Sequence, residues 1–177
     1  MPLVVFLKGV NVGGYRTVRP SLLASELQKY GVINIGGAGT FVVPKPVSQA
    51  RMRQELLRCL PFETAVMICP GRELIAAAAA NPFDRKPTSP DVVRFVSVLA
   101  KRPPIPPSMP IRLPPKGKWL LRFLSTQGRF VFGLYRREMR VISVLGGIDK
   151  IFGMPVTTRN WNTIRAVLTI LEKEQNS

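Results

Sequence analysis

The chain has 177 residues, 46% of them hydrophobic, which is enough for one large core or two small ones and excludes a disordered protein. Lys and Arg total 26 against 10 Asp and Glu, and the net charge of +16 favours polyanions or acidic proteins as partners. Histidine is absent and the two cysteines, Cys59 and Cys69, lack the CxxC spacing, so a tetrahedral zinc site has no usual ligand set.

Hydrophobicity and charge also constrain where the protein works. No apolar run approaches the roughly 18 to 20 residues that span a bilayer, and the N-terminal apolar run is too short for a signal peptide. We therefore expect a cytoplasmic protein with reduced thiols, no membrane contact, no metal and no cofactor. Residues 81–177 hold seventeen basic and six acidic side chains, whereas residues 1–80 hold nine and four, so most of the positive charge lies in the second half.

The first half of the chain predicts the element order β-α-β-β-α-β. The apolar run Leu3 to Leu7 indicates a strand buried on both faces. The spacing then predicts a helix from about Pro20 to Gly31, strands at 32–35 and 40–43, a helix at 48–60 and a strand at 62–68. This is the order of the ferredoxin-like fold, whose antiparallel sheet carries both helices on one face. The opposite face must be open or covered by the rest of the chain.

The second half predicts a strand-rich region that ends in a helix. After a helix at 73–80, a boundary is expected at 81–90, where Pro82, Pro87 and Pro90 occur. A strand at 91–100 leads into residues 101–116, whose seven prolines predict an extended linker or surface loop. The remaining expected elements are strands at 118–124, 129–135 and 139–145, a helical turn at 148–152 and a helix from about 159 to 174. The predicted class is α+β, with a ferredoxin-like subdomain at 1–82 and a second α+β subdomain at 90–177.

The glycine-rich loop after the first strand is one candidate ligand site. Glycines allow backbone N–H groups to approach a ligand, and neighbouring side chains add donors. The candidate residues are Lys8, Asn11, Gly13, Gly14 and Arg16. The loop has neither the GxGxxG spacing nor the GK[ST] ending of known phosphate motifs, and a tight turn with positive φ explains its glycines more simply.

The tract Thr157 to Thr163 is expected to open the last helix and is a second candidate. A helix N-terminus attracts anions, so Thr158, Arg159, Asn160 and Asn162 are candidate ligand-binding residues, facing the glycine loop. In the alternative, Trp161 and Ile164 anchor the helix while the polar side chains only cap it.

A third candidate is a basic strip in the second half, suited to a phosphate backbone. Its residues are Lys118, Arg122, Arg129, Arg136, Arg137 and Arg140. The segment 128–135 also spaces its aromatic residues like an RNA-recognition strand, with Phe130 and Phe132 on one face. A core strand and a solvated charged surface are the alternatives.

Two segments resemble one known family. Gly9 to Gly14, GVNVGG, is similar to the RGINVGG opening of the bacterial domain of unknown function 1697, and Gly153 to Ile164, GMPVTTRNWNTI, is similar to its closing GVPATTRNWNTV. The resemblance implies two ferredoxin-like α+β subdomains in a cytoplasmic bacterial protein whose activity is unassigned. The chain departs from the family in three places. Residues 37–43 read GAGTFVV where the family usually has QSGNVVF, and the family's GIGRSKL stretch is reduced to residues 146–152. The proline-rich loop replaces what is commonly a helix.

These patterns favour a non-catalytic module that binds a polyanion such as nucleic acid. No histidine and no paired carboxylates are available for acid–base chemistry, so we do not expect an enzyme. The alternatives are a small anionic-ligand site or undetected enzyme between residues 9–14 and 157–163, and a homo-oligomeric scaffold such as a homodimer.

Overall fold

A computed structural model of the chain describes residues 1–83 and 89–177, which form two compact units. The first unit comprises residues 1–75 and 162–177, and the second comprises residues 76–161. The C-terminal helix thus groups with the start of the chain.

The boundary expected near 81–90 falls partly on residues 84–88, so that part, with Pro87, lies outside the described residues. The subdomain limits 1–82 and 90–177 stay predictions.

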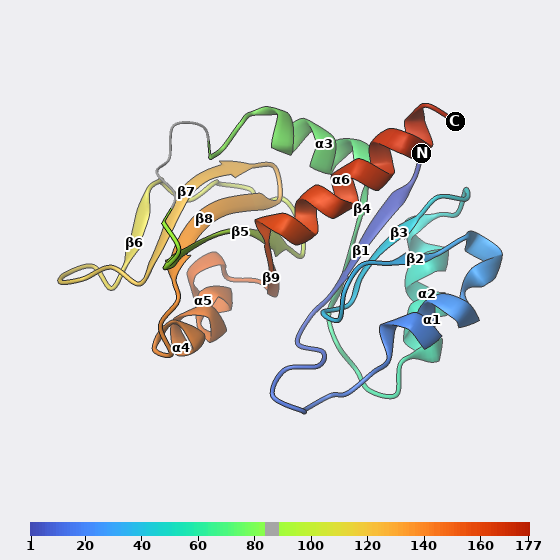
Figure 1. Cartoon of the computed structure of the whole chain (residues 1–177), viewed down its shortest axis with the longest axis horizontal. Coiled ribbons are helices and arrows are strands. Elements are labelled where there is room, and N and C mark those ends of the chain that lie inside the picture. Colours follow the sequence, from blue (N-terminus) through green and yellow to red (C-terminus); the bar gives the residue numbers. More distant parts are fainter. Residues whose placement is uncertain (84–88) are drawn as a thin grey trace. The chain divides into compact units, whose positions relative to one another are not determined.

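The first unit has the predicted ferredoxin-like order around an antiparallel sheet. Its strands are arranged β2-β3-β1-β4, and β1 pairs antiparallel with both β3 and β4. The elements are β1 (Leu3–Leu7), α1 (Pro20–Glu26), the short 3-10 helix η1 (Gln28–Tyr30), β2 (Ile33–Asn34), β3 (Thr40–Val43), α2 (Gln49–Cys59) and β4 (Val66–Pro70). Figure 1 shows β1 at the centre of this sheet, with α1 and α2 on one side of it.

The central strand is apolar at every position because both of its faces are covered. One face of the sheet packs on α1 and α2, with Val5, Phe41 and Ile68 in the shared core. On the other face Phe6, Met67 and Cys69 are at most 1% exposed.

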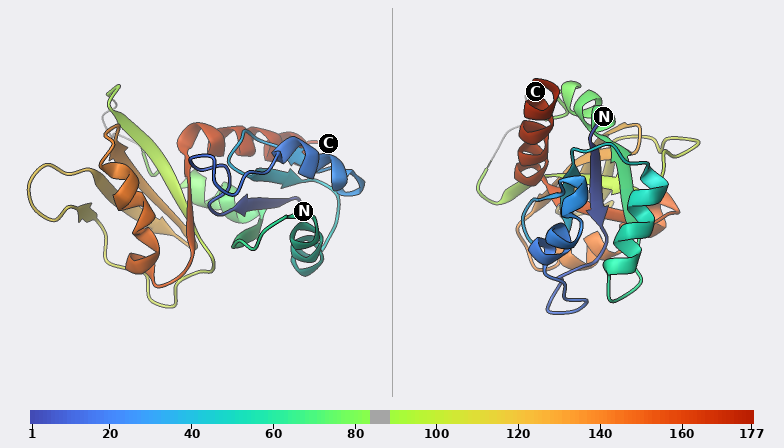
Figure 2. Two further views of the ribbon diagram at one scale, coloured as in Figure 1. Left: turned by 90° about the horizontal axis from the view of Figure 1, so that it is seen from below. Right: turned by 90° about the vertical axis from the view of Figure 1, so that its right-hand side faces the viewer.

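Helices α3 (Gly71–Ala79) and α6 (Trp161–Gln175) contribute residues 71–75 and 162–175 to the first unit, and these lie on that second face. Their first-unit parts run on the side of the sheet opposite α1 and α2 (Figures 1 and 2). The α6 side chains Ile164, Val167 and Leu171 are buried at helical spacing, and a Cβ at Gly71 would meet Leu171 Cδ2 at 2.6 Å. The face left open by the sequence analysis is therefore covered by the end of the chain.

The second unit is an antiparallel five-stranded sheet in the order β6-β7-β8-β5-β9. Its elements are β5 (Val92–Leu99), β6 (Ile111–Leu113), β7 (Leu121–Gln127), β8 (Phe130–Arg136), α4 (Val141–Gly146), α5 (Ile148–Phe152) and β9 (Val156–Asn160). One face packs against α4 and α5, and its core includes Phe95, Phe123 and Ile148. Gly133 belongs to this face. A Cβ added to Gly133 would lie 2.4 Å from Phe95 Cζ, so the Phe95 ring fills the space that a side chain at position 133 would need.

Three sequence predictions for the second unit are wrong. Residues 139–145 form no strand, because Val141, Val144 and Leu145 contact the core at helical spacing in α4. The proline-rich segment 101–116 contains the short edge strand β6, which pairs with β7. Residues 157–160 belong to strand β9 on the edge of β5, and the last helix begins only at Trp161.

Candidate functional site

In the first unit, the glycine loop is held by the side chain of Asn11. Its Nδ2 donates to the Gly37 carbonyl at 2.8 Å, and its Oδ1 accepts the Val18 N–H at 2.8 Å. Asn11 itself has φ 57°, a left-handed conformation that asparagine tolerates better than most residues. The amide expected to meet a ligand thus ties the loop to the β2–β3 turn.

The other residues predicted in this loop also have structural roles. Gly13 and Gly14 have φ 58° and 75°, with nothing within 4 Å of an added Cβ, so backbone conformation and not space calls for glycine. Arg16 Nη1 donates to the Glu63 carbonyl at 3.1 Å, and the Lys8 carbonyl accepts a hydrogen bond from Thr64.

In the second unit, the tract Thr157 to Asn160 is a strand, so the helix-start geometry expected for it is absent. Thr158 Oγ1 lies 2.8 Å from Ser97 Oγ across the strand pair. Arg159 is 6% exposed, and its Nη1 donates to Thr157 Oγ1 at 2.7 Å and to the Thr158 carbonyl at 2.9 Å. Burial lowers the pKa of Arg159 to about 10, which leaves the guanidinium charged at neutral pH.

Two further residues of this tract lie beyond Arg159. Asn160 is the exposed last residue of β9, and Asn162 is exposed in the first turn of α6. Asn162 belongs to the first unit and the other three candidates belong to the second. The four residues that the sequence analysis placed at one helix start are therefore separated: three lie in β9 and one lies in α6.

The aromatic residues of β8 form core and no open stacking surface. Phe130 and Phe132 are at most 1% exposed. The Phe132 ring packs edge-on against Phe83 and Trp161, with centroids 5.9 Å and 6.2 Å away. The RNA-recognition interpretation is therefore wrong, since bases cannot reach these rings.

The predicted basic strip separates into two places. Arg129 precedes β8, where its Nε donates to the Leu99 carbonyl at 3.0 Å and its Nη2 to the Ala100 carbonyl. Arg136 ends the same strand seven residues later, where its guanidinium and that of Arg122 contact the Trp119 ring. Arg129 is thus positioned by the sheet and lies apart from the rest.

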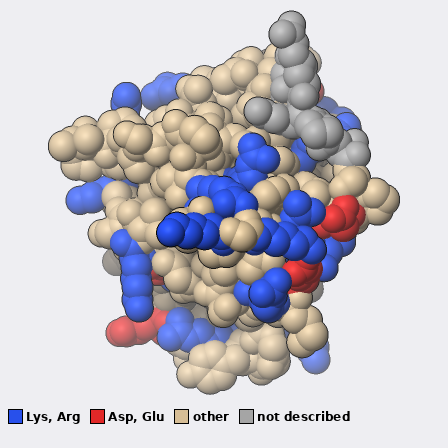
Figure 3. All heavy atoms as spheres, turned by 90° about the vertical axis from the view of Figure 1, so that its left-hand side faces the viewer, with Lys and Arg blue, Asp and Glu red and all other residues tan. Residues whose placement is uncertain are grey.

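At the Arg136 end, cations gather around Trp119. The Trp119 ring lies 4.1 Å from Arg136 Cζ and 5.3 Å from Arg122 Cζ. Lys118 Nζ lies 2.5 Å and Arg140 Nη2 3.4 Å from the carboxylate of Glu138, and the Lys118 hydrogen bond is the main cause that lowers the Glu138 pKa. Figure 3, viewed from the side where β6 and β7 lie in Figure 1, shows Lys and Arg gathered with few acidic side chains beside them.

Strand register adds two arginines that the sequence analysis missed. Arg112 of β6 lies opposite Arg122 of β7, which lies opposite Leu134 of β8, and Leu134 lies opposite Arg94 of β5. Directly paired residues share a sheet face, so three arginines stand in one cross-strand row. Arg136, two residues beyond Leu134, is on the same face. We call Arg94, Arg112, Arg122 and Arg136 the arginine face.

One sequence signal pointed to this face. Arg94 interrupts the apolar run VVRFVSVL, and a charge within such a strand marks a face that is not wholly core. Arg112, by contrast, lies among prolines, where no strand was expected.

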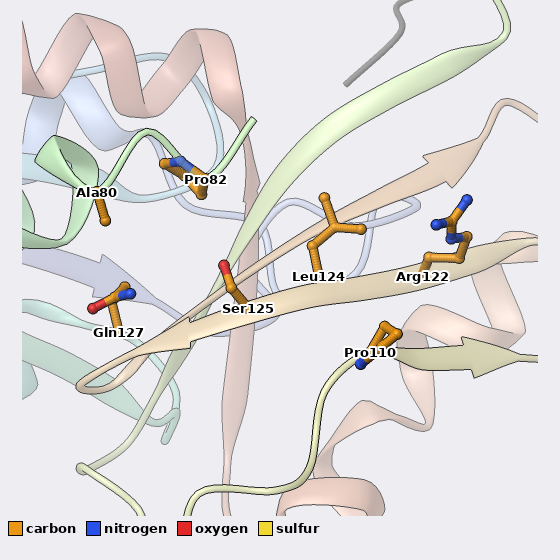
Figure 4. Close-up of a pocket in the computed structure, with 7 residues that line it drawn as sticks. All are labelled: Ala80, Pro82, Pro110, Arg122, Leu124, Ser125 and Gln127. Carbon is orange, nitrogen blue, oxygen red and sulfur yellow. The ribbon is translucent and has the colours of Figure 1, made fainter. Parts of the chain in front are cut away.

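A hollow of about 380 Å³ lies beside the arginine face within the second unit. Its polar lining comes from Arg122, Ser125 and Gln127 of β7. Figure 4 shows Arg122, Leu124 and Ser125 rising from the same side of β7, with Ala80 and Pro82 near its Gln127 end and Pro110 at the start of β6. The sequence analysis included only Arg122 of these residues, because a hollow depends on packing.

The described parts of the chain contain no cluster of metal-ligating side chains. In residues 1–83 and 89–177, no group of three His, Cys, Asp or Glu side chains could hold a metal ion. Cys59 and Cys69 are free thiols, and burial is the main cause that raises the pKa of Cys59.

Comparison with known families gives a match over residues 1–109 to the model described as protein of unknown function, DUF1697. The chain belongs to the DUF1697 family. The matched range includes the glycine loop and ends within the proline-rich segment, so it covers residues 1–75 of the first unit and residues 76–109 of the second.

Among solved structures, the DUF1697 chain is similar to the conserved bacterial protein SP0830 from Streptococcus pneumoniae. The TM-score is 0.53 at 16% identity, over 96% of this chain and 98% of that one. This likeness shows a common fold. No match was found among curated proteins. None of the helices in the described residues combines the length and hydrophobicity needed to cross a bilayer.

Proposed function

We propose that this DUF1697 protein is a non-catalytic module that binds nucleic acid through the arginine face of its second unit. The observation that carries the proposal is the cross-strand row of Arg94, Arg112 and Arg122, continued by Arg136 beside Trp119. Like charges directly opposite each other destabilise a sheet, and the Arg112–Arg122 pair carries this cost although Arg112 also donates to the Pro115 and Gly117 carbonyls. A polyanion across the strands would remove that cost.

Guanidinium groups suit this role because each presents five donors in a planar fork that matches phosphate oxygens. Acidic side chains near the face are Asp91, 3.3 Å from Arg136, and Glu138, which pairs with Lys118 and Arg140. The predicted residues Lys118, Arg137 and Arg140 extend the positive surface at its edge. Arg159 is left out of the interface because it is only 6% exposed, and Arg129 is left out because it lies at the other end of β8 from Arg136.

The proposal concerns phosphate-backbone contacts, which position a nucleic acid without reading its sequence. It includes a cytoplasmic location, where free thiols such as Cys59 and Cys69 stay reduced.

Filter binding of a single-stranded DNA of about 16 nucleotides at stepped salt tests the proposal. Each lost phosphate contact lowers the salt slope of log K by about 0.7 on single strands. We expect the double variant Arg122→Ala/Arg136→Ala to lower the slope by about 1.4 and the low-salt affinity by roughly 10- to 100-fold.

The matched control is Arg72→Ala/Arg165→Ala, which removes the same charge from exposed helix positions elsewhere. We expect it to keep the wild-type salt slope. No binding by the wild type at low salt, or equal losses in the two double variants, would overturn the proposal.

A further inference from the structure

The hollow on β7 owes its polar lining to a β-bulge. Phe123 pairs with Gly133, but Ser125 pairs with Phe132, so one extra residue stands between them. Regular alternation would place Arg122, Leu124 and Thr126 on one face. The bulge instead brings Ser125 and Gln127 to the side of Arg122, since register after the bulge is shifted by one residue.

Among the described residues, no hydrogen bond accounts for the position of these polar side chains. In the part of the chain that the structure describes, the side chains of Arg122, Ser125 and Gln127 form no hydrogen bond to the protein, and Arg122 only stacks near Trp119. A guanidinium, a hydroxyl and an amide therefore border the hollow with their donors and acceptors available.

The rest of the wall is apolar and built from compact side chains. Ala80, Pro82, Pro110 and Leu124 supply it. A hollow of about 380 Å³ is within the usual range of ligand sites, which combine apolar walls with a few placed polar groups.

We infer that this hollow receives one base of a single-stranded nucleic acid whose backbone lies on the arginine face; the inference rests on the proposed function. The apolar wall suits the faces of a heterocyclic ring, and the Gln127 amide, which both donates and accepts, suits the edge of a base. Arg122 belongs to both the row and the hollow, so it joins the base site to the phosphate site.

The experiment compares a single-stranded DNA with an abasic strand of the same length and charge, by fluorescence anisotropy at constant salt. We expect the wild type to bind the normal strand roughly 10-fold more tightly, because only that strand offers a base to the apolar wall and to the Ser125 and Gln127 side chains. Ser125→Ala/Gln127→Ala should remove this preference and leave binding of the abasic strand unchanged.

A second variant, Ala80→Trp, fills the hollow from the exposed residue that follows α3 and should have the same effect. Circular dichroism verifies that both variants are folded. Equal wild-type affinity for the two strands, or a base preference that survives both folded variants, overturns the base site while the proposed function stands. If neither strand binds to the wild type, both proposals are wrong.

Discussion

Among single residues, Glu55 on α2 is a carboxylate held by three cations. Its oxygens lie 2.6 Å from Arg51, 2.7 Å from Arg58 and 3.3 Å from Lys29, while the residue itself is 3% exposed. The cations are largely solvated, so each loses little hydration in the contact. The hydrogen bond from Arg58 is the main cause that lowers the pKa of Glu55.

Because the folded-state pKa of Glu55 is below its ordinary value, its charge stabilises the fold above that value. The contribution is lost as pH falls from about 4.5 through the folded pKa. We expect Glu55→Gln to have a lower Tm than the wild type at neutral pH, and the difference to shrink as pH falls below about 4.5. Thermal unfolding monitored by circular dichroism over a pH series measures it. The control Glu172→Gln, exposed on α6, should show no such pH-dependent difference; a Glu55→Gln difference that stays constant with pH would contradict the prediction.

The sequence shows which residues are charged, but it could not predict which charged side chains are buried or which share a face of the sheet. Arg159 sits in a polar tract, TTRNWNT, which resembles an exposed helix start, yet strand pairing with β5 buries its guanidinium. The cross-strand row of arginines depends on register between segments that are far apart in the chain, which no local pattern contains.

Among the elements, the glycine loop is well fixed although it is exposed. The Asn11 side chain bridges Gly37 and Val18, and the Arg16 guanidinium bonds to Glu63. The tip, by contrast, presents Tyr15 at 72% exposure.

We expect Asn11→Ala to lower the unfolding free energy by about 1–3 kcal/mol, because it removes two hydrogen bonds and places alanine at positive φ. Asn11→Gly loses the same bonds but tolerates the φ of 57°, so its loss should be smaller. Urea unfolding ranks the variants, and trypsin cleavage after Arg16 reports loop opening. A wild-type urea midpoint and cleavage rate in Asn11→Ala would show that the side chain does not hold the loop.

At the same scale, periodicity predicted the elements of the first unit well and failed in part of the second. β1 and α2 have unambiguous patterns, with five apolar residues in a row and a helical stripe capped by Ser48. The segment 139–145 fits both the helical and the strand period of hydrophobic residues, and it forms a helix because Val141 and Leu145 both contact the core.

At the scale of the whole molecule, the first unit is assembled from both ends of the chain. Residues 162–177 supply the α6 side chains that cover the second face of the ferredoxin-like sheet. A ferredoxin-like order can be predicted from 70 residues, but the covering of its outer face cannot, because that contact joins segments about a hundred residues apart.

Leu171 is 1% exposed and packs where a Cβ of Gly71 would stand, so Leu171→Ala should cost about 2–5 kcal/mol of unfolding free energy. In a Cys59→Ser background the thiol of Cys69, on the covered face, should react faster with a thiol reagent, because that face opens more often. The control Thr169→Ala changes an exposed position of the same helix and should leave both the urea midpoint and the thiol rate unchanged. If Cys69 is equally protected in Leu171→Ala and the wild type, α6 is not what seals this face.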